Sequence, residues 1–279
     1  KLNQVTNTLI HAHQFSGRII QNKKFIVDIH GLEHIQDRNL IKGFPITSWK
    51  KYGYIAKSIY YKKIEEKLFK NAVHLICSSE DIQEKVKKIQ NSTLVRNAVF
   101  IDEFLPCDNS ELKIVLVGPF LPGTINFEGL NIISKIVKKF PKIKFTFIGK
   151  TNEFFKNQLK NENTEFLGVV NDYKSTLRKY SVLFAPYPNH AKYLGSKNKF
   201  LEAAACKMPI ITTSSGAVDF RNDLLSIGNT TEKISNLIKY LMDENNRKDI
   251  GNKLRREIEE KYNAEIEVKK IVELYNEYE

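Results

Sequence analysis

Short β-branched runs that alternate with amphipathic helical segments constrain the fold of this chain more than any other feature of its sequence. The clearest run, residues 113–118, is apolar almost throughout, as is typical of strands that a parallel sheet buries on both faces. Residues 126–139 follow it with an apolar stripe at helical spacing. Three further strand-like runs lie at 144–148, 182–185 and 209–212. This alternation predicts an α/β chain with a doubly wound parallel sheet, which binds ligands at the carboxyl ends of its strands.

The first part of the chain has the same alternation with fewer strands. Four short strand-like runs lie at 8–12, 25–29, 73–77 and 93–96. Helical segments are expected at about 56–70 and 80–89. A complete Rossmann-like domain carries more strands than this, so either the leading βα units of this part are absent or the domain is minimal, and we expect that they are absent.

A stretch rich in turn residues divides the two parts. Residues 104–110 combine Pro, Asp, Asn and Ser, which favour turns over regular structure. We therefore expect an N-terminal Rossmann-like domain over residues 1–107 and a C-terminal one over residues 108–279. Residues 232–279 are helical in pattern almost throughout, and the final helix could cross back to the N-terminal domain.

The charge of the chain narrows the classes of its partners. Its 279 residues include 44 Lys and Arg against 32 Asp and Glu, a net charge of +12 that favours anionic partners. Nucleic acid, acidic lipid and phosphorylated small molecules all meet this condition. The aromatic residues form no signature of a common nucleic-acid-binding module, so we expect no nucleic-acid partner. A nucleic-acid-binding module is the alternative to an enzyme that the basic charge leaves open.

The compartment is predicted from features that the sequence lacks. No apolar run approaches the ~18 residues of a membrane-spanning helix. The first residues lack the apolar stretch of a signal peptide. The three cysteines, Cys77, Cys107 and Cys206, lie far apart and have neither a metal-binding nor a disulfide pattern. We therefore expect a protein of the reducing cytoplasm.

Residues 195–213 are the most informative about function. A loop that contains Lys197 leads into a helix that begins near Asn198, and an apolar strand follows. Free N–H groups at the start of a helix form an anion site, to which Lys197 and Lys199 add positive charge. Glu202 lies one turn further on, where its carboxylate can accept hydrogen bonds from a diol. The pattern fits a sugar nucleotide, and an ordinary strand–loop–helix connection with solvated side chains is the alternative.

This stretch resembles the donor-binding signature of retaining glycosyltransferases with the GT-B fold, and of glycosyltransferase family 4 (glycosyl transferases group 1) in particular. Gly195, Asn198, Lys199, Glu202 and Pro209 follow the order of that signature. Five further segments resemble the family in order and spacing, at 65–79, 96–99, 113–118, 145–149 and 165–172. The resemblance implies two Rossmann-like domains and the transfer of a sugar, with retention of configuration, from a nucleotide-sugar to a hydroxyl of a glycan or lipid-linked acceptor.

The resemblance also implies roles for individual residues. Glu202 binds the donor ribose, and His30 faces the reacting sugar; these two are the catalytic candidates. The expected donor contacts are Gly118, Lys150, Val169, Val170, Gly195, Ser196, Lys197, Asn198 and Lys199. Without the resemblance, His30 fits a turn or core histidine, which is what we expect of His11, His13 and His74.

Three positions depart from the family pattern. Leu194 stands where the family often has the first of two glutamates, Pro119 where it has an arginine, and Glu128 near its usual lysine. The diphosphate must then be neutralised by other cations, for which Lys150, Arg178, Lys197 and Lys199 are candidates. We find no cluster of His, Asp or Cys at metal-ligand spacing and expect neither a metal nor another cofactor. A catalytically degenerate binding protein and a GT-B sugar-nucleotide epimerase are the alternatives.

Residues 49–70 form a second candidate site. Lysines interleave there with aromatic residues, as in helices that lie on anionic lipid. The candidate membrane contacts are Lys50, Lys51, Lys57, Lys62 and Lys63. They predict attachment to the inner face of a membrane, and a solvated helix face is the alternative.

Overall fold

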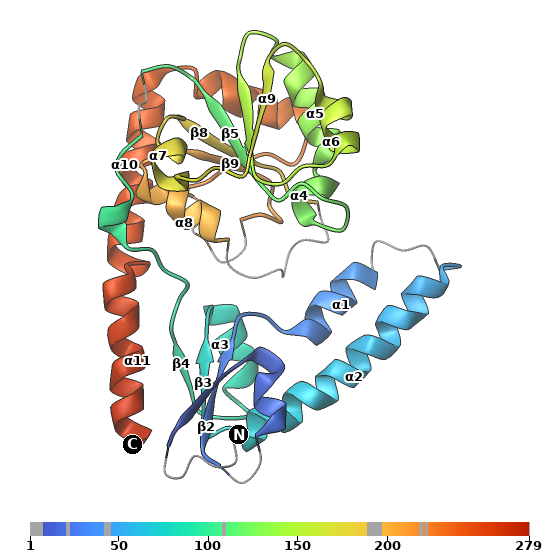
Figure 1. Cartoon of the computed structure of the whole chain (residues 1–279), viewed down its shortest axis with the longest axis vertical. Helices are drawn as coiled ribbons and strands as arrows, with labels where there is room; N and C mark the ends of the chain where they lie inside the picture. Colours follow the sequence, from blue (N-terminus) through green and yellow to red (C-terminus); the bar gives the residue numbers. More distant parts are fainter. Residues whose placement is uncertain are drawn as a thin grey trace. The chain divides into compact units, whose positions relative to one another are not determined.

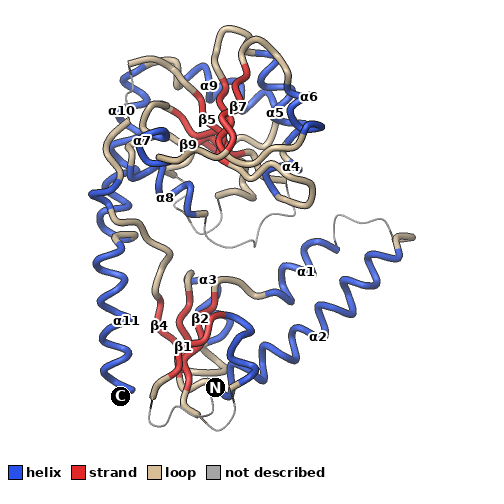
Figure 2. Tube along the Cα trace, in the orientation of Figure 1, coloured by secondary structure: helices blue, strands red, loops and turns tan. Residues whose placement is uncertain are grey.

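The structure is a computed structural model that describes residues 8–20, 23–41, 46–107, 110–188, 197–217, 220 and 223–278. It consists of two compact units (Figure 1). Lys1–Asn97 and Ala264–Glu279 belong to the first unit, and Ala98–Lys192 and Lys197–Asn263 to the second. Each unit contains one parallel β-sheet, as the tube coloured by secondary structure shows (Figure 2). The predicted α/β class with two parallel sheets is confirmed.

The sheet of the first unit has four strands in chain order. They are β1 (Ile10–His13), β2 (Phe25–Ile29), β3 (His74–Cys77) and β4 (Ser92–Leu94). The helices of this unit are η2 (Gln14–Ile19), α1 (Glu33–Ile41), α2 (Trp49–Asn71), α3 (Glu80–Val86) and α11 (Ala264–Tyr278). All strand pairs are parallel, and the register sets His13 of β1 opposite Asp28 of β2. The carboxyl ends of β1 and β2 therefore meet at one edge of the sheet.

Both faces of the first sheet are covered. Val27 and Ile29 of β2 pack in one apolar cluster with Leu68 of α2. Ile26, which points to the other face, packs with Leu274 of α11. Burial on both faces explains why β2 is apolar over most of its length.

The sheet of the second unit has six parallel strands. They are β5 (Ile114–Val117), β6 (Phe145–Ile148), β7 (Thr164–Gly168), β8 (Val182–Ala185), β9 (Ile210–Thr212) and β10 (Ser226–Ile227). In space their order is β10-β9-β8-β5-β6-β7. The chain builds outward from β5 to β7 and then returns to the other side of β5. The strand order thus reverses between β5 and β8, which is the point where doubly wound sheets bind their ligands.

Helices cover both faces of the second sheet. They are α4 (Ile125–Glu128), α5 (Leu130–Lys139), α6 (Glu153–Leu159), α7 (Tyr173–Leu177), α8 (Asn198–Ala205), α9 (Thr231–Tyr240) and α10 (Glu244–Lys261). Side chains of α5 and α9 share one apolar cluster with Ile114 and Leu116, and side chains of α8 and α10 share another with Val115. Alternate residues of β5 thus serve two cores.

The division between the units falls after Asn97, ten residues before the predicted boundary at 107. The reason is packing: Val99, the short helix η3 (Ile101–Glu103), Phe104 and Cys107 contribute to an apolar cluster of the second unit. The turn-rich stretch therefore belongs to that unit. The final helix, α11, belongs to the first. None of the helices in the described part of the chain combines the length and apolar character that a bilayer crossing requires.

Candidate functional site

Three glycines shape the carboxyl edge of the second sheet. Gly118 follows β5, Gly149 follows β6, and Gly168 ends β7. The Gly118 N–H donates to the Ile148 carbonyl at 2.8 Å, and the Gly149 N–H donates to the Gly168 carbonyl at 2.7 Å. Gly149 has a φ of +119°, and a Cβ there would lie 3.2 Å from the Gly118 Cα. A side chain at position 149 would separate the backbones of these adjacent connections.

Gly118 has a local reason to be glycine. A Cβ at this position would lie 2.6 Å from the ring of Phe120, which is buried in the core. The family resemblance implies a different reason, approach of the backbone to phosphate. Packing against Phe120 alone excludes a larger residue here.

Glu202 is held by a tyrosine from another helix. It lies on α8, and its Oε2 accepts a hydrogen bond from the Tyr173 hydroxyl of α7 at 2.8 Å. Burial raises the pKa of the Glu202 carboxyl, and the hydrogen bond from Tyr173 opposes this rise. Burial and the nearby Glu202 carboxylate raise the pKa of Tyr173, which keeps the hydroxyl protonated as a donor. Glu202 is only half-buried, so an oriented carboxylate is available to a ligand.

Lys199 brings a cation to the end of β5. Its Nζ donates to the Val117 carbonyl at 2.8 Å and to the Asn126 Oδ1 at 2.6 Å. Burial lowers the pKa of the ammonium to about 7, and the charge of Lys197 adds to the decrease. Among the residues described, no carboxylate lies within salt-bridge distance of it. The lysine is held by neutral acceptors beside Gly118, an arrangement that leaves its charge for an anionic ligand.

Helix α8 begins at the same place. Lys197 occupies its N-cap position and makes no side-chain cap hydrogen bond. The ammonium groups of Lys197 and Lys199 lie 5.4 and 5.1 Å from the ring centroid of Tyr187, which follows β8. The positive end of the helix dipole and two lysines therefore coincide at the point where the strand order reverses.

The remaining predicted donor contacts differ in position. Gly195 and Ser196 lie outside the described residues. Lys150 is exposed just after Gly149, and Val169 is 69% exposed. Val170 packs against an apolar cluster of the unit. The structure thus brings Gly118, Lys197, Lys199 and Glu202 to one region through named contacts. The backbone of Lys150 adjoins this region, since its carbonyl accepts from the Phe120 N–H at 2.8 Å, while its side chain is exposed.

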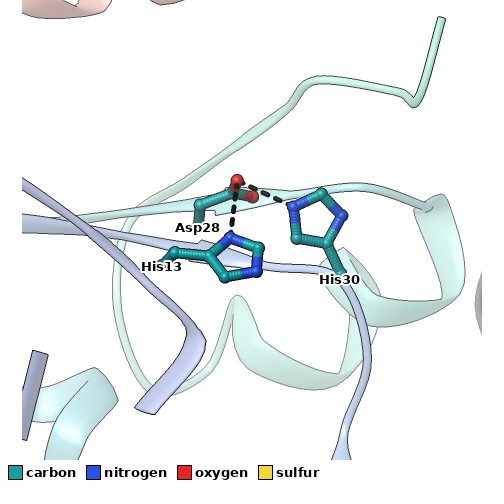
Figure 3. Close-up of side chains that lie close together, drawn as sticks. All are labelled: His13, Asp28 and His30. Atoms are coloured by element: carbon teal, nitrogen blue, oxygen red, sulfur yellow. Dashed lines mark hydrogen bonds and ion pairs between the residues drawn. The ribbon is translucent and has the colours of Figure 1, made fainter. Parts of the chain in front are cut away.

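The first unit carries a separate polar cluster (Figure 3). Asp28 of β2 accepts a hydrogen bond from the Nε2 of His30 at 2.8 Å on its Oδ2. The Nδ1 of His13, at the end of β1, lies 3.6 Å from the same oxygen. The rings of His13 and His30 have centroids 4.7 Å apart. Both imidazoles therefore share one carboxylate oxygen at the sheet edge.

The polar cluster is held in place by the His30–Asp28 hydrogen bond and by hydrogen bonds of the backbone. The hydrogen bond to Asp28 raises the pKa of His30, and burial opposes the rise. Burial acts to raise the pKa of Asp28, but the hydrogen bond and charge of His30 outweigh it and lower that pKa. With its amide in the orientation that satisfies both donors, Gln14 accepts from the N–H groups of His30 and Gly31 at 2.9 and 3.1 Å. His30 is held at both side chain and backbone, unlike a solvated turn histidine.

Sequence reasoning missed several of these partners. Tyr173 was not expected to bind Glu202, and His13 was expected to be structural. No metal-ligand cluster was expected either, yet His13, Asp28 and His30 offer three ligand atoms within 4.8 Å of one another. The sequence held part of the signal, because adjacent parallel strands place their carboxyl ends together, but the register that sets His13 opposite Asp28 came only from the structure. By contrast, His74 bonds Thr93 and Tyr278 inside the unit, as a structural histidine would.

Helix α2 exposes an apolar stripe. Its exposed large apolar side chains are Trp49, Tyr52, Ile55, Ile59 and Tyr60. Trp49, Tyr52, Ile55 and Ile59 are spaced by three to four residues and Tyr60 adjoins Ile59, so the five lie on one side of the helix. Ser58, Glu65, Leu68 and Phe69 are buried. Lys57 is tied to the buried Asp37 at 3.1 Å, and Lys62 lies 3.7 Å from Glu66. Lys50 and Lys63 are exposed near the stripe, and Lys51 is half-buried.

Comparison of this sequence with models of protein families finds one match. The family model of glycosyl transferases group 1 matches residues 111–244, which run from before β5 to the start of α10. No curated protein sequence matches the chain. The matched region contains Gly118, Lys199 and Glu202, so it coincides with the region built above.

Comparison of structures finds the same architecture in glycosyltransferases. Sucrose-phosphate synthase from Thermosynechococcus elongatus aligns with a TM-score of 0.72 and 17% identity, over 96% of this chain and 73% of that one. HepE from Anabaena, solved with UDP and glucose, aligns with a TM-score of 0.67 and 11% identity, over 91% and 72%. A variant of TarM from S. aureus, solved with fondaparinux, alpha-GlcNAc-glycerol and UDP, gives 0.64 and 16%, over 92% and 51%. At these identities the likeness establishes the fold, which is GT-B.

Proposed function

We propose that this chain transfers a sugar from a nucleotide-sugar donor to a hydroxyl acceptor, with retention of configuration at the sugar. The observation that carries the proposal is the pairing of Lys199 and Glu202 on one helix at the reversal of strand order. The first is a cation held by neutral acceptors, and the second is a carboxylate oriented by Tyr173. An anion and a diol on the same ligand, as in a nucleoside diphosphate sugar, would satisfy both.

Lys199 takes the place of the missing family cations in this proposal. The family positions for an arginine and a lysine are Pro119 and Glu128 in this chain. Lys199 reaches the end of β5 from α8 and places its ammonium beside Gly118. The diphosphate would bind there, against the amides that open α8, and its pentose would bind Glu202 one turn further on.

The chemistry that follows is electrostatic. As the bond from the sugar to the diphosphate breaks, negative charge grows on the diphosphate oxygen, and Lys199, Lys197 and the α8 dipole stabilise it. The acceptor oxygen forms the new bond to the sugar carbon on the face that the diphosphate leaves, and the leaving oxygen takes the acceptor proton, so configuration is retained. His30 would polarise the reacting sugar. Side chains and backbone groups stabilise the negative charge of the leaving diphosphate. We therefore propose that transfer requires neither a metal nor another cofactor.

The primary test is donor binding by the full chain. UDP-, GDP- and ADP-sugars are titrated by calorimetry, and a saturating donor at a hundred times its Kd should stabilise the fold by about 2.7 kcal/mol. Glu202→Ala should weaken the preferred donor by about 10- to 100-fold, because charge-assisted hydrogen bonds to the ribose are lost. The exposed Glu162→Ala is the matched control.

Four outcomes would contradict the proposal. If no nucleotide-sugar of the panel bound, or if wild type and Glu202→Ala bound the donor with equal affinity, the proposed donor site would be wrong. Binding without transfer to any glycan or lipid-linked acceptor would favour a catalytically degenerate binding protein. Epimerised nucleotide-sugar formed without an acceptor would favour an epimerase.

We further propose that the α2 stripe contacts an anionic membrane surface, which would give access to a lipid-linked acceptor at the cytoplasmic face. The stripe combines an exposed tryptophan and two exposed tyrosines with nearby lysines, and the chain as a whole is strongly basic. Aromatic side chains suit the interface between headgroups and acyl chains, and lysines suit anionic headgroups. A lipid surface therefore matches both components of the stripe.

Trp49 makes this second proposal directly measurable, because it is the single tryptophan of the chain. Its fluorescence should shift to shorter wavelength with vesicles that contain anionic lipid and stay unchanged with zwitterionic vesicles. In a sedimentation assay, Tyr52→Ser with Tyr60→Ser should reduce binding, while the exposed Tyr240→Ser of α9 should not. Equal sedimentation of both variants would leave the stripe as a solvated helix face.

A further inference from the structure

The polar cluster of the first unit has the donors and spacing of a metal site. Its ligand atoms are two imidazole nitrogens and one carboxylate oxygen, a set that Zn²⁺ binds in proteins. In a tetrahedral site with bonds of about 2.0–2.2 Å, neighbouring ligand atoms lie about 3.3 Å apart. The observed separations from the Asp28 Oδ2 are 2.8 Å to His30 and 3.6 Å to His13, one on each side of that value. The third separation, between the two imidazole nitrogens, is at most 4.8 Å, so the geometry is completed by moving one imidazole toward the other two ligand atoms.

The backbone already holds two of the three ligands. Asp28 lies in β2, whose side chains Val27 and Ile29 are buried in the core. His30 follows directly, and Gln14 binds its backbone N–H. Asp28 and His30 are therefore in place before any ion binds, which limits the conformational entropy that binding must overcome.

His13 supplies the adjustable ligand. Its side chain is 67% exposed, so it can rotate toward an ion without disturbing the core. The partial exposure of His30 leaves room for a water molecule as the fourth ligand. His11 lies on the same strand, but its Nδ1 is engaged by the Tyr275 hydroxyl at 2.6 Å, and it is not one of the three convergent groups.

We propose that His13, Asp28 and His30 bind a divalent transition-metal ion, for which Zn²⁺ is the best match. The His13 Nδ1, the Asp28 Oδ2 and the His30 Nε2 form the three bonds to the ion. The proton that His30 shares with Asp28 leaves to solvent, so each bound ion releases at least one proton when the cluster starts protonated. Mg²⁺ prefers oxygen ligands in an octahedral shell and should bind poorly to this set.

One consequence rests on the proposed function. An ion on the His30 Nε2 removes that nitrogen from interaction with a sugar, so Zn²⁺ should inhibit transfer. Binding of the ion does not depend on this consequence, because it is measured without donor or acceptor. The two claims can therefore fail separately.

The test uses the full chain, freed of metal with a chelator and dialysed against ZnCl₂ or MgCl₂. We expect saturable binding of one Zn²⁺ per chain and no comparable binding of Mg²⁺. Loss of an outer-shell partner costs a metal site about 10- to 100-fold in affinity, so loss of a ligand in His13→Ala should cost at least about tenfold. His11→Ala is the matched control on the same strand and should retain the affinity.

Two further readouts keep the test decisive. Co²⁺ in place of Zn²⁺ should give the visible absorption of a tetrahedral site with nitrogen and oxygen ligands. A thiolate charge-transfer band would assign the ion to a cysteine instead and overturn the proposal. Thermal unfolding of His13→Ala, whose side chain is exposed, checks that the variant is folded. The proposal is also overturned if folded His13→Ala binds Zn²⁺ as wild type does, if His11→Ala loses as much affinity, or if wild type shows no saturable binding.

Discussion

The two polar sites of this chain differ in how their charges are satisfied. In the second unit, Lys199 donates to neutral oxygens and Glu202 accepts from a neutral hydroxyl. The two charges attract each other, but no salt bridge joins them in the described structure, so each can still meet a ligand. In the first unit, Asp28 is paired with His30 and lies near His13, so charge is met within the cluster. The first arrangement suits recognition of an ionic substrate. The second suits groups that exchange a proton or an ion.

The sheets explain part of this difference. The second sheet reverses its strand order between β5 and β8, and α8 begins beside that point. The first sheet runs in chain order without a reversal, and its polar cluster forms where two adjacent strands end. A helix start and a reversal provide backbone donors for an anion, whereas two strand ends provide only the side chains that they carry.

The largest expected effect separates turnover from donor binding. His30→Ala should lower kcat of sugar transfer by about 100-fold, the lower range for loss of a positioned proton-transfer group. The donor Kd measured by calorimetry should stay within about twofold, because donor recognition is proposed to lie in the second unit. His11→Ala serves as the control. A large change in donor Kd with unchanged kcat would break the comparison between the two sites.

The second effect concerns the charge of Lys199. Lys199→Met should weaken the preferred nucleotide-sugar by about tenfold, because a buried cation next to the diphosphate is lost. Since burial lowers the pKa of Lys199 to about 7, wild-type donor affinity should also fall as pH rises above that value. The variant should lose this pH dependence. A nucleotide-sugar is the right probe, since it has no terminal phosphate that titrates near neutral pH.

The lowered pKa of Lys199 also predicts how the stability of the fold depends on pH. A lysine in the unfolded chain titrates near its ordinary pKa of about 10.4, above the folded value. Between these two values the unfolded state binds more protons, so the free energy of unfolding should rise with pH over this window. Below about 7 both states are protonated and the dependence disappears. Urea unfolding of wild type and Lys199→Met at a series of pH values checks this. If the free energy of unfolding changed with pH in the same way for both proteins, Lys199 would have an ordinary pKa.

Hydrophobic pattern was enough to predict the sheets. All eight predicted strands, β1 to β6, β8 and β9, lie within two residues of their predicted positions, whereas β7 and β10 were not predicted. Helix α1 was not predicted, because its polar sequence has little apolar periodicity. It is held instead by contacts with α2, where Glu65 binds the Glu33 N–H at 2.7 Å and also His34. Such contacts depend on tertiary packing that no local pattern encodes.

The candidate sites show the same limit. The position of Glu202 on a helix after a loop could be predicted, since both signals lie within a few residues. Its partner Tyr173 lies 29 residues earlier and meets it only through the sheet. His13 and Asp28 are opposed by the register of two strands, which the sequence leaves open. Sequence therefore predicted the residues of the donor region better than the partners that orient them.

The smallest expected effect tests whether that orientation matters. Tyr173→Phe removes one hydroxyl and leaves the ring of a half-buried residue in place. The hydrogen bond to Glu202 is worth about 0.5–1.5 kcal/mol net, so donor affinity should fall by about two- to tenfold with kcat little changed. Because Tyr173 opposes the rise that burial causes in the Glu202 pKa, the variant should also bind donor less well toward acidic pH. Tyr180→Phe, a tyrosine of the same unit outside the site, is the control. If Tyr173→Phe bound donor as wild type does at every pH, Glu202 would be oriented by its helix alone, and the contrast with the charge-paired cluster of the first unit would weaken.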